Sequence, residues 1–208
     1  MNKPNLDKLY EIASNQQGFF TAHQATKCGY SRQLQVYYVK KGEWIRHARS
    51  IFKLLCFSET SPFPDDYYIT LLWSENQQGH FEGVMGYTTA LYIHGLTDTA
   101  PEDIHFIVPK RFRRNSPPPG RIRFHRRDLL PELIASVEGL KVMTVFGAVR
   151  DLLMRNSLTE PSLFAILNTA LEKGTITVEE IEHLASQLHQ KPQIVQTLAE
   201  IVDTRKGA

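Results

Sequence analysis

The chain has 208 residues, of which 42% are hydrophobic, a formal net charge of +2 and two cysteines outside any CxxC pair. This composition excludes an intrinsically disordered chain, a disulfide framework and a cysteine-ligated zinc site. The N-terminus lacks the apolar stretch of a signal peptide and no segment approaches the roughly 20 apolar residues of a membrane span, so we expect a cytoplasmic protein without a membrane partner.

The first part of the chain predicts three short helices and a hairpin. Asn5, Thr21 and Ser31 are the expected N-caps, and Gly29 and Gly42 end the second and third helices. Only two residues separate these two helices, which is the tight turn of a helix-turn-helix motif. The alternating apolar and basic residues that follow predict the β-hairpin of a wing.

The rest of the chain predicts a linker and a mixed α/β domain. Proline, serine and aspartate in SETSPFPDD indicate the linker. Thr177 and Glu180 form an expected capping box. The elements expected after the linker are a helix or strand at 67–73, a helix at 83–95, strands at 103–110, 121–126 and 140–145, and helices from about 146.

The predicted class is therefore α+β. An N-terminal winged helix-turn-helix domain over residues 1–57 is followed by the linker at 58–66 and by a mixed α/β domain with a C-terminal helical bundle over residues 67–208.

Charge is unevenly distributed along the chain. Residues 1–60 carry a net charge of +5, residues 61–150 are neutral, and residues 151–208 carry −3. A basic first part beside an acidic tail indicates that the two ends meet different partners, the first of them a polyanion.

The third helix has donors and acceptors suited to base edges. With Leu34 facing inward, the helical period places Tyr37, Tyr38 and Lys41 within about 60° of it and leaves an outer arc of Arg32, Gln33, Gln35, Val36, Val39 and Lys40. Arginine can bond guanine, glutamine can bond adenine, and valine can touch a thymine methyl group. An ordinary solvated helix face is the alternative. The predicted DNA-binding residues are Thr21, Ser31, Arg32, Gln33, Gln35, Val36, Lys40, Lys41, Arg46, Arg49 and Lys53, the last three on the wing.

Two segments carry a family resemblance. GFFTAHQATKCGYSRQLQVYYVKKGEWIRHARSIFKL resembles the N-terminal winged helix of AbiEi-type antitoxins from bacterial abortive-infection systems. Ser50 departs from the pattern, because the family favours glycine at this turn, and a non-glycine residue with positive φ is strained. The matching residues are Gly18, Thr21, Ala25, Gly29, Ser31, Arg32, Leu34, Gly42, Arg46, Arg49 and Phe52.

The second segment is GYTTALYIHGLTDTAPEDIHFIVPKR, which is similar to a later stretch of the same family. FHRRDL and VMTVFGAVRDLL resemble its later strand and helix, whereas residues 156–208 match only as a generic helical tail. The matching residues are Ala90, Leu91, His94, Gly95, Leu96, Thr97, Asp98, Pro101, Ile104, Val108 and Pro109.

The resemblance implies an antitoxin that also represses its own operon. Its partners would be double-stranded operator DNA and a nucleotidyltransferase-like toxin, and it would act as a non-enzyme without a catalytic residue, metal or cofactor. Palindromic half-sites would require a homo-oligomer on DNA or two monomers. A stand-alone regulator with an oligomerisation or effector domain is the alternative, and a nuclease using Asp103 and Lys110 is the remaining one.

Two further groups of residues are candidates for a site: a set of histidines and aspartates, and a run of basic residues. His94, His105, His125, Asp98 and Asp103 lack metal-ligand spacing, and we expect His94 to cap or pack its helix. The run from 110 to 127 is a possible second basic surface for nucleic acid or an acidic partner, or alternatively a charged edge strand that resists aggregation. Its basic residues are Lys110, Arg111, Arg113, Arg114, Arg121, Arg123, Arg126 and Arg127.

Overall fold

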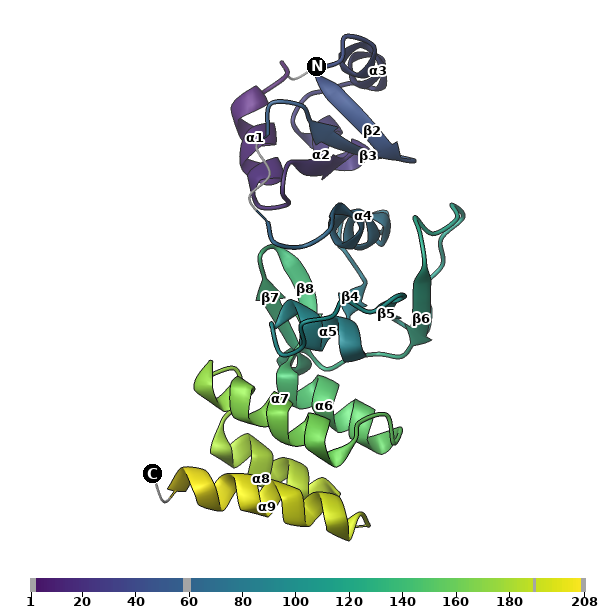
Figure 1. Cartoon of the computed structure of the whole chain (residues 1–208). Coiled ribbons are helices and arrows are strands. Elements are labelled where there is room, and N and C mark those ends of the chain that lie inside the picture. Colours follow the sequence, from purple (N-terminus) through teal and green to yellow (C-terminus); the bar gives the residue numbers. More distant parts are fainter. Residues whose placement is uncertain (1–2, 58–60, 189, 207–208) are drawn as a thin grey trace. The chain divides into compact units, whose positions relative to one another are not determined.

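The computed structural model describes residues 3–57, 61–188 and 190–206 (Figure 1). Over these residues it contains nine α-helices and two β-sheets, which confirms the α+β class. No helix in this described part is long and apolar enough to cross a bilayer. The chain divides into two compact units, the first drawn from Met1–Val84, Phe106–Asp128 and Ser136–Lys141 and the second from Met85–His105, Leu129–Ala135 and Val142–Ala208. The domain boundaries expected from sequence stay a prediction.

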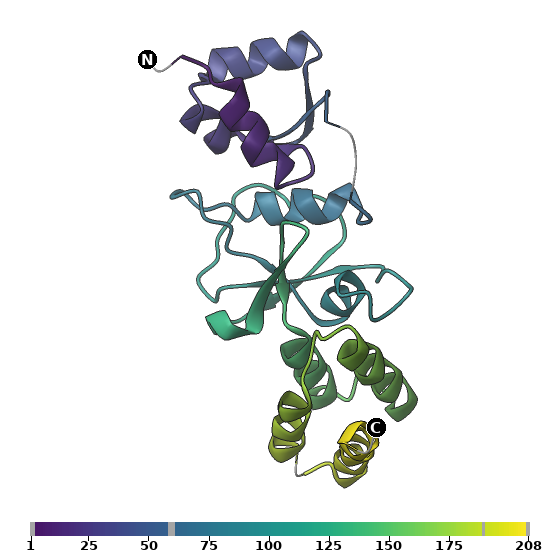
Figure 2. The same ribbon diagram turned by 90° about the vertical axis from the view of Figure 1, so that its left-hand side faces the viewer.

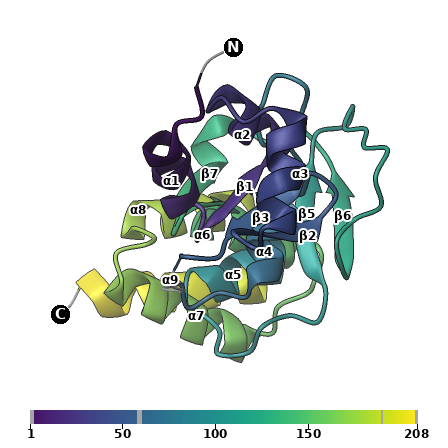
Figure 3. The ribbon, with the colours of Figure 1, turned by 90° about the horizontal axis from the view of Figure 1, so that it is seen from above.

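Six elements open the first unit. Figure 3 views them from above, with α3 beside the β2–β3 hairpin. They are α1 (Leu6–Ser14), β1 (Phe19–Thr21), α2 (Ala22–Lys27), α3 (Arg32–Lys40), β2 (Trp44–Ala48) and β3 (Ile51–Leu54).

The three helices begin where their caps predict. The side chains of Asn5, Thr21 and Ser31 accept hydrogen bonds from backbone N–H groups in the first turns of α1, α2 and α3, at 2.9, 3.1 and 3.3 Å. Each cap satisfies an N–H group that has no partner within its helix. Gly29 and Gly42 follow α2 and α3 with positive φ, as expected of residues that end helices.

The three-stranded sheet has the order β1-β3-β2, with both pairs antiparallel. The sequence does not predict strand β1, because its three residues, Phe19–Thr21, are all buried and show no alternation. Trp44 lies at the centre of the core between sheet and helices. Its ring centroid is 4.7 Å from that of Phe20, 5.0 Å from Tyr30 and 5.3 Å from Tyr38. Such aromatic pairs contribute about 0.5–1.5 kcal/mol each beyond the area that they bury.

Helix α4 (Asp65–Trp73) resolves the ambiguous segment at 67–73. Its residues from Tyr67 to Trp73 are all buried, so the helical period is hidden. Asp65 and Asp66, expected in the linker, are its first two residues, whereas residues 58–60 of that linker lie outside the described residues.

The second sheet has the order β6-β5-β4-β8-β7. The helix expected over 83–95 begins only at Tyr87, because the two residues of β4 pair in this sheet instead. The elements are β4 (Val84–Met85), α5 (Tyr87–Ile93), β5 (Ile104–Val108), β6 (Ile122–Arg126), the 3₁₀ helix at Pro131–Leu133, β7 (Ile134–Val137) and β8 (Leu140–Met143).

The end of the chain is helical, as its apolar spacing predicts (Figure 2). Helices α8 and α9 contact each other, and each contacts one of the two preceding helices. The predicted capping box is present, since Thr177 and Glu180 bond each other's backbone N–H groups. The helices are α6 (Val145–Met154), α7 (Glu160–Glu172), α8 (Val178–Gln187) and α9 (Pro192–Lys206).

Candidate nucleic-acid interface

Helix α3 exposes much of the face that sequence predicts. Arg32, Gln33, Val36 and Lys40 are exposed. Tyr37, which the helical period places near the inward side, is 54% exposed. Leu34 and Tyr38 pack against the core of the first unit. The outward face of α3 is therefore both polar and apolar, as a surface that contacts base edges and methyl groups requires.

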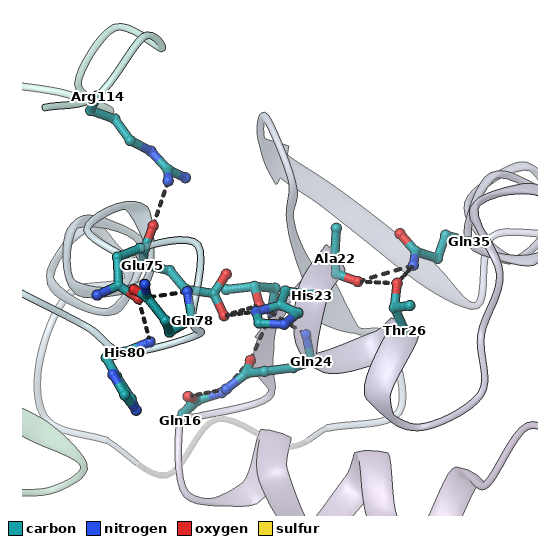
Figure 4. A network of polar contacts seen from close by, with 12 residues as sticks. Gln16, Ala22, His23, Gln24, Thr26, Gln35, Glu75, Gln78, His80 and Arg114 are labelled. Carbon is teal, nitrogen blue, oxygen red and sulfur yellow. Dashed lines mark hydrogen bonds and ion pairs between the residues drawn. The ribbon is translucent and has the colours of Figure 1, made fainter.

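Gln35 is the exception, because it is buried rather than outward-facing. Its side chain is 4% exposed, and Nε2 donates to the carbonyl oxygens of Ala22 and Tyr30 at 3.1 and 3.0 Å and to Oγ1 of Thr26 at 3.1 Å. Its amide is engaged in fixing α2 and the following turn against α3 (Figure 4). Gln35 also lines the groove between α3 and the hairpin, so its contact with DNA stays a prediction.

The hairpin presents two exposed arginines. Arg46 lies on β2 opposite Phe52 of β3, and the register shifts between Arg46 and Ala48. Arg49 and Ser50 form the turn, and both arginines are exposed. Ser50 has a φ of 65°, so this serine adopts the left-handed conformation that usually favours glycine.

A groove of about 490 Å³ lies between α3 and the hairpin. Arg32 and Lys40 reach it from the helix and Arg46 and Arg49 from the hairpin, and these four cations make no ion pair within the described residues. The apolar part of its lining comes from Ala22, Val36, Val39 and Phe52, and no carboxylate contributes. A basic groove with an apolar lining suits a polyanion that also has apolar surface, such as the edge of a DNA groove.

Three other predicted residues serve the fold. Ser31 uses its hydroxyl group to cap α3. Thr21 is 1% exposed, and Lys53 is 5% exposed with its ammonium group 3.0 Å from Oδ2 of Asp65. The prediction that Thr21 and Lys53 contact DNA is wrong, because neither reaches the surface. Lys41 is exposed but paired with Glu43, which raises the pKa of the Lys41 ammonium group through their hydrogen bond.

Glu75 is a buried acidic residue with polar partners that the sequence does not predict. Its buried carboxylate accepts a hydrogen bond from Oγ1 of Thr21 at 3.0 Å and lies 3.3 Å from Nδ1 of His23 (Figure 4). The backbone carbonyl of Glu75 accepts a hydrogen bond from the Arg114 guanidinium group. No sequence signal relates Glu75 to Thr21, which lies 54 positions earlier, so only the fold brings them together.

In the second basic run, from 110 to 127, some side chains are exposed and others bond backbone carbonyl oxygens. Lys110, Arg111 and Arg113 are exposed. Arg114 bonds Glu75, and Arg126 donates to the carbonyl oxygen of Phe112 at 2.7 Å. Arg121 and Arg123 are exposed and Arg127 is half-buried.

The histidine at the end of α5 has the capping position expected from sequence. His94 is the C-cap residue, and its Nε2 lies 2.9 Å from the carbonyl oxygen of Met143. Burial lowers the pKa of His94, and the hydrogen bond to Met143 offsets part of that effect. Cys28 is also buried, and burial raises the pKa of its thiol, which disfavours the reactive thiolate.

Comparison with known proteins gives a fold likeness. No protein-family model matches the chain, and no curated protein matches it significantly. Among solved structures, the chain is similar to the crystal structure of the RV2827C protein from Mycobacterium tuberculosis, with a TM-score of 0.52 and 14% sequence identity over 98% of this chain and 78% of that one. At this identity the likeness shows the fold alone.

Proposed function

We propose that residues 3–57 form a winged helix-turn-helix that binds double-stranded operator DNA and represses transcription. The element order α1–β1–α2–α3–β2–β3, with the hairpin beside α3, supports this assignment. The observation that carries it is the groove in which Arg32, Lys40, Arg46 and Arg49 stand without ion-pair partners among the described residues.

Each residue has a role set by its position. Arg32, Gln33 and Val36 contact base edges from the exposed face of α3. Lys40, Arg46 and Arg49 contact phosphates, which positions the helix without reading sequence.

An electrophoretic mobility shift on the DNA upstream of the gene tests this proposal. The wild type gives a salt-sensitive shift, and the Arg32→Ala/Arg46→Ala/Arg49→Ala variant loses it. The absence of a salt-sensitive shift, or one that the triple substitution leaves unchanged, would overturn the proposal.

We further propose that the protein is the antitoxin of a nucleotidyltransferase-like toxin. The support is the ordered resemblance of two segments, at 18–54 and 86–111, to AbiEi-type antitoxins. Co-expression with the neighbouring gene tests it: that gene alone arrests growth and this chain restores it. A neighbouring gene that is harmless, or whose toxicity this chain leaves unchanged, would contradict the antitoxin role without affecting the DNA-binding proposal.

A further inference from the structure

Residues 110–116, which follow β5, form a segment that we call the cationic arm. A surface depression of about 820 Å³ is lined by this arm and by Arg126. Five of its lining residues are cations and none is a carboxylate: Lys110, Arg111, Arg113, Arg114 and Arg126. Because like charges repel each other, such a grouping favours an anionic ligand.

The arm is held in place by its own contacts. Phe112 is 4% exposed, and its ring centroid lies 5.5 Å from that of Trp73. Trp73 also donates from Nε1 to Oγ of Ser116 at 3.0 Å. Arg126 and Arg114 anchor the arm through their bonds to the Phe112 and Glu75 carbonyl oxygens. A ligand therefore meets a backbone that is already ordered, which reduces the entropy lost on binding.

Because Arg114 and Arg126 bond backbone carbonyl oxygens, three cations of the arm remain for a ligand. Lys110, Arg111 and Arg113 are exposed, and their side chains make no hydrogen bond or ion pair with any described residue. They are spaced along a fixed segment of chain, as contacts to successive phosphates of a polymer would require.

The arm lies beside the hairpin turn within the first unit. A second cavity, of about 460 Å³, is lined by Arg49 and Ser50 from the turn and by Arg113 and Asn115 from the arm. Glu75 and Glu82 also line this cavity and oppose an anion inside it. The two carboxylates disfavour an anion inside this cavity, whereas Arg49 and Arg113 place a cation on the turn and on the arm beside it.

We propose that the cationic arm binds the phosphate backbone of DNA next to the segment held by α3 and the hairpin. This inference rests on the proposed DNA-binding function and extends the contact surface beyond the winged helix. Duplex DNA is favoured over an acidic protein because the arm continues a surface that begins at Arg49 of the proposed interface.

Fluorescence anisotropy with labelled duplexes from the DNA upstream of the gene, all centred on the same site, tests the inference. Duplexes of about 12 and about 40 base pairs, roughly one and four helical turns, separate the central contact from the flanking one. The full-length Arg111→Ala/Arg113→Ala variant is compared with wild type and with Lys3→Ala/Lys8→Ala, which removes two exposed charges elsewhere.

The arm variant binds the short duplex like wild type and the long duplex about tenfold more weakly. Its slope of log K against log salt on the long duplex is shallower by about 1.8, or about 0.9 for each lost phosphate contact. The Lys3→Ala/Lys8→Ala control behaves like wild type on both.

The two proposals fail in different ways. If wild type binds both duplexes and the arm variant matches it on the long one, the arm inference is overturned while the winged-helix proposal stands. If wild type binds neither duplex, the DNA-binding proposal fails and the arm inference fails with it.

Discussion

The backbone N–H of Ala22 donates a hydrogen bond to the carbonyl oxygen of Ser50 at 2.8 Å. The first residue of α2 is thus tied to the turn at the tip of the hairpin. The bond restrains the backbone beside Arg49. The position of this proposed phosphate contact therefore depends on the turn in which Ser50 has a positive φ.

Replacing Ser50 by glycine should stabilise the protein. Ser50 has a φ of 65°, and an L-residue in this region costs about 1–2 kcal/mol, of which glycine's greater freedom in the unfolded chain offsets about 0.5–1 kcal/mol. We expect Ser50→Gly to raise the free energy of unfolding by about 0.5–1 kcal/mol in urea denaturation. Ala48→Gly, on the neighbouring strand, is the control and should lower it. A Ser50→Gly protein less stable than wild type would show that the serine side chain is needed.

Gln35 and Gln33 should respond differently to the same substitution. Gln35→Leu removes the amide whose two N–H groups serve three acceptors, and we expect the free energy of unfolding to fall by about 1–3 kcal/mol. Gln33→Leu on the exposed face should change it by no more than about 0.5 kcal/mol. Thermal denaturation of the two variants checks the contrast, and equal stabilities would mean that the Gln35 amide does not hold α2 to α3.

Substitutions of Lys53 and Arg49, two cations of the hairpin, should differ in their effect on DNA affinity. Lys53 is buried against Asp65, and Arg49 is exposed at the turn. We expect Lys53→Met to leave the affinity for upstream DNA within about twofold and Arg49→Met to weaken it several-fold, because only Arg49 reaches a phosphate. Anisotropy titration at constant salt measures both, and a loss of affinity in Lys53→Met with wild-type stability would return Lys53 to the interface.

His94 should make stability depend on pH. Its pKa is lowered in the folded protein, so the unfolded chain binds the proton more readily. The stability contributed by neutral His94 is complete above the unfolded-state pKa of about 6.5 and is lost as pH falls through that value towards the folded-state pKa, by at most about 1.4 kcal/mol per pH unit.

Urea denaturation between about pH 7.5 and 5.5 tests this dependence, which His94→Gln should reduce. Gln can still donate to the carbonyl oxygen of Met143. His183→Gln, at an exposed position, is the control and should retain the wild-type dependence. An unchanged pH profile in His94→Gln would contradict the assignment.

Local chemistry explains what sequence predicts well. Asn5, Thr21 and Ser31 cap helices through contacts only three positions away, so the residues that make the contact are neighbours in the sequence. The same holds for the capping box of Thr177 and the glycines that end α2 and α3. Arg49 is exposed in the turn that joins the two predicted strands, and that turn is also a local feature.

Distant contacts explain what sequence reasoning missed. The sequence predicts Lys53 at the surface of the wing, but the carboxylate of Asp65 in α4 accepts a hydrogen bond from its ammonium group. The helical period counted from Leu34 predicts Gln35 on the outer arc, and the backbone carbonyls that satisfy its amide lie in the preceding helix and turn. In both cases a polar side chain is buried because partners from another element satisfy it, which a helical or strand period does not reveal.

The most direct test of the account is the salt dependence of DNA affinity for wild type and for Arg46→Ala/Arg49→Ala, measured by anisotropy on the upstream duplex. If both arginines contact phosphates, the double variant binds more weakly, and its slope of log K against log salt is shallower by about 1.8. A wild-type affinity that does not depend on salt, or a slope unchanged in the variant, would contradict the claim that α3 and the hairpin form a DNA-binding surface.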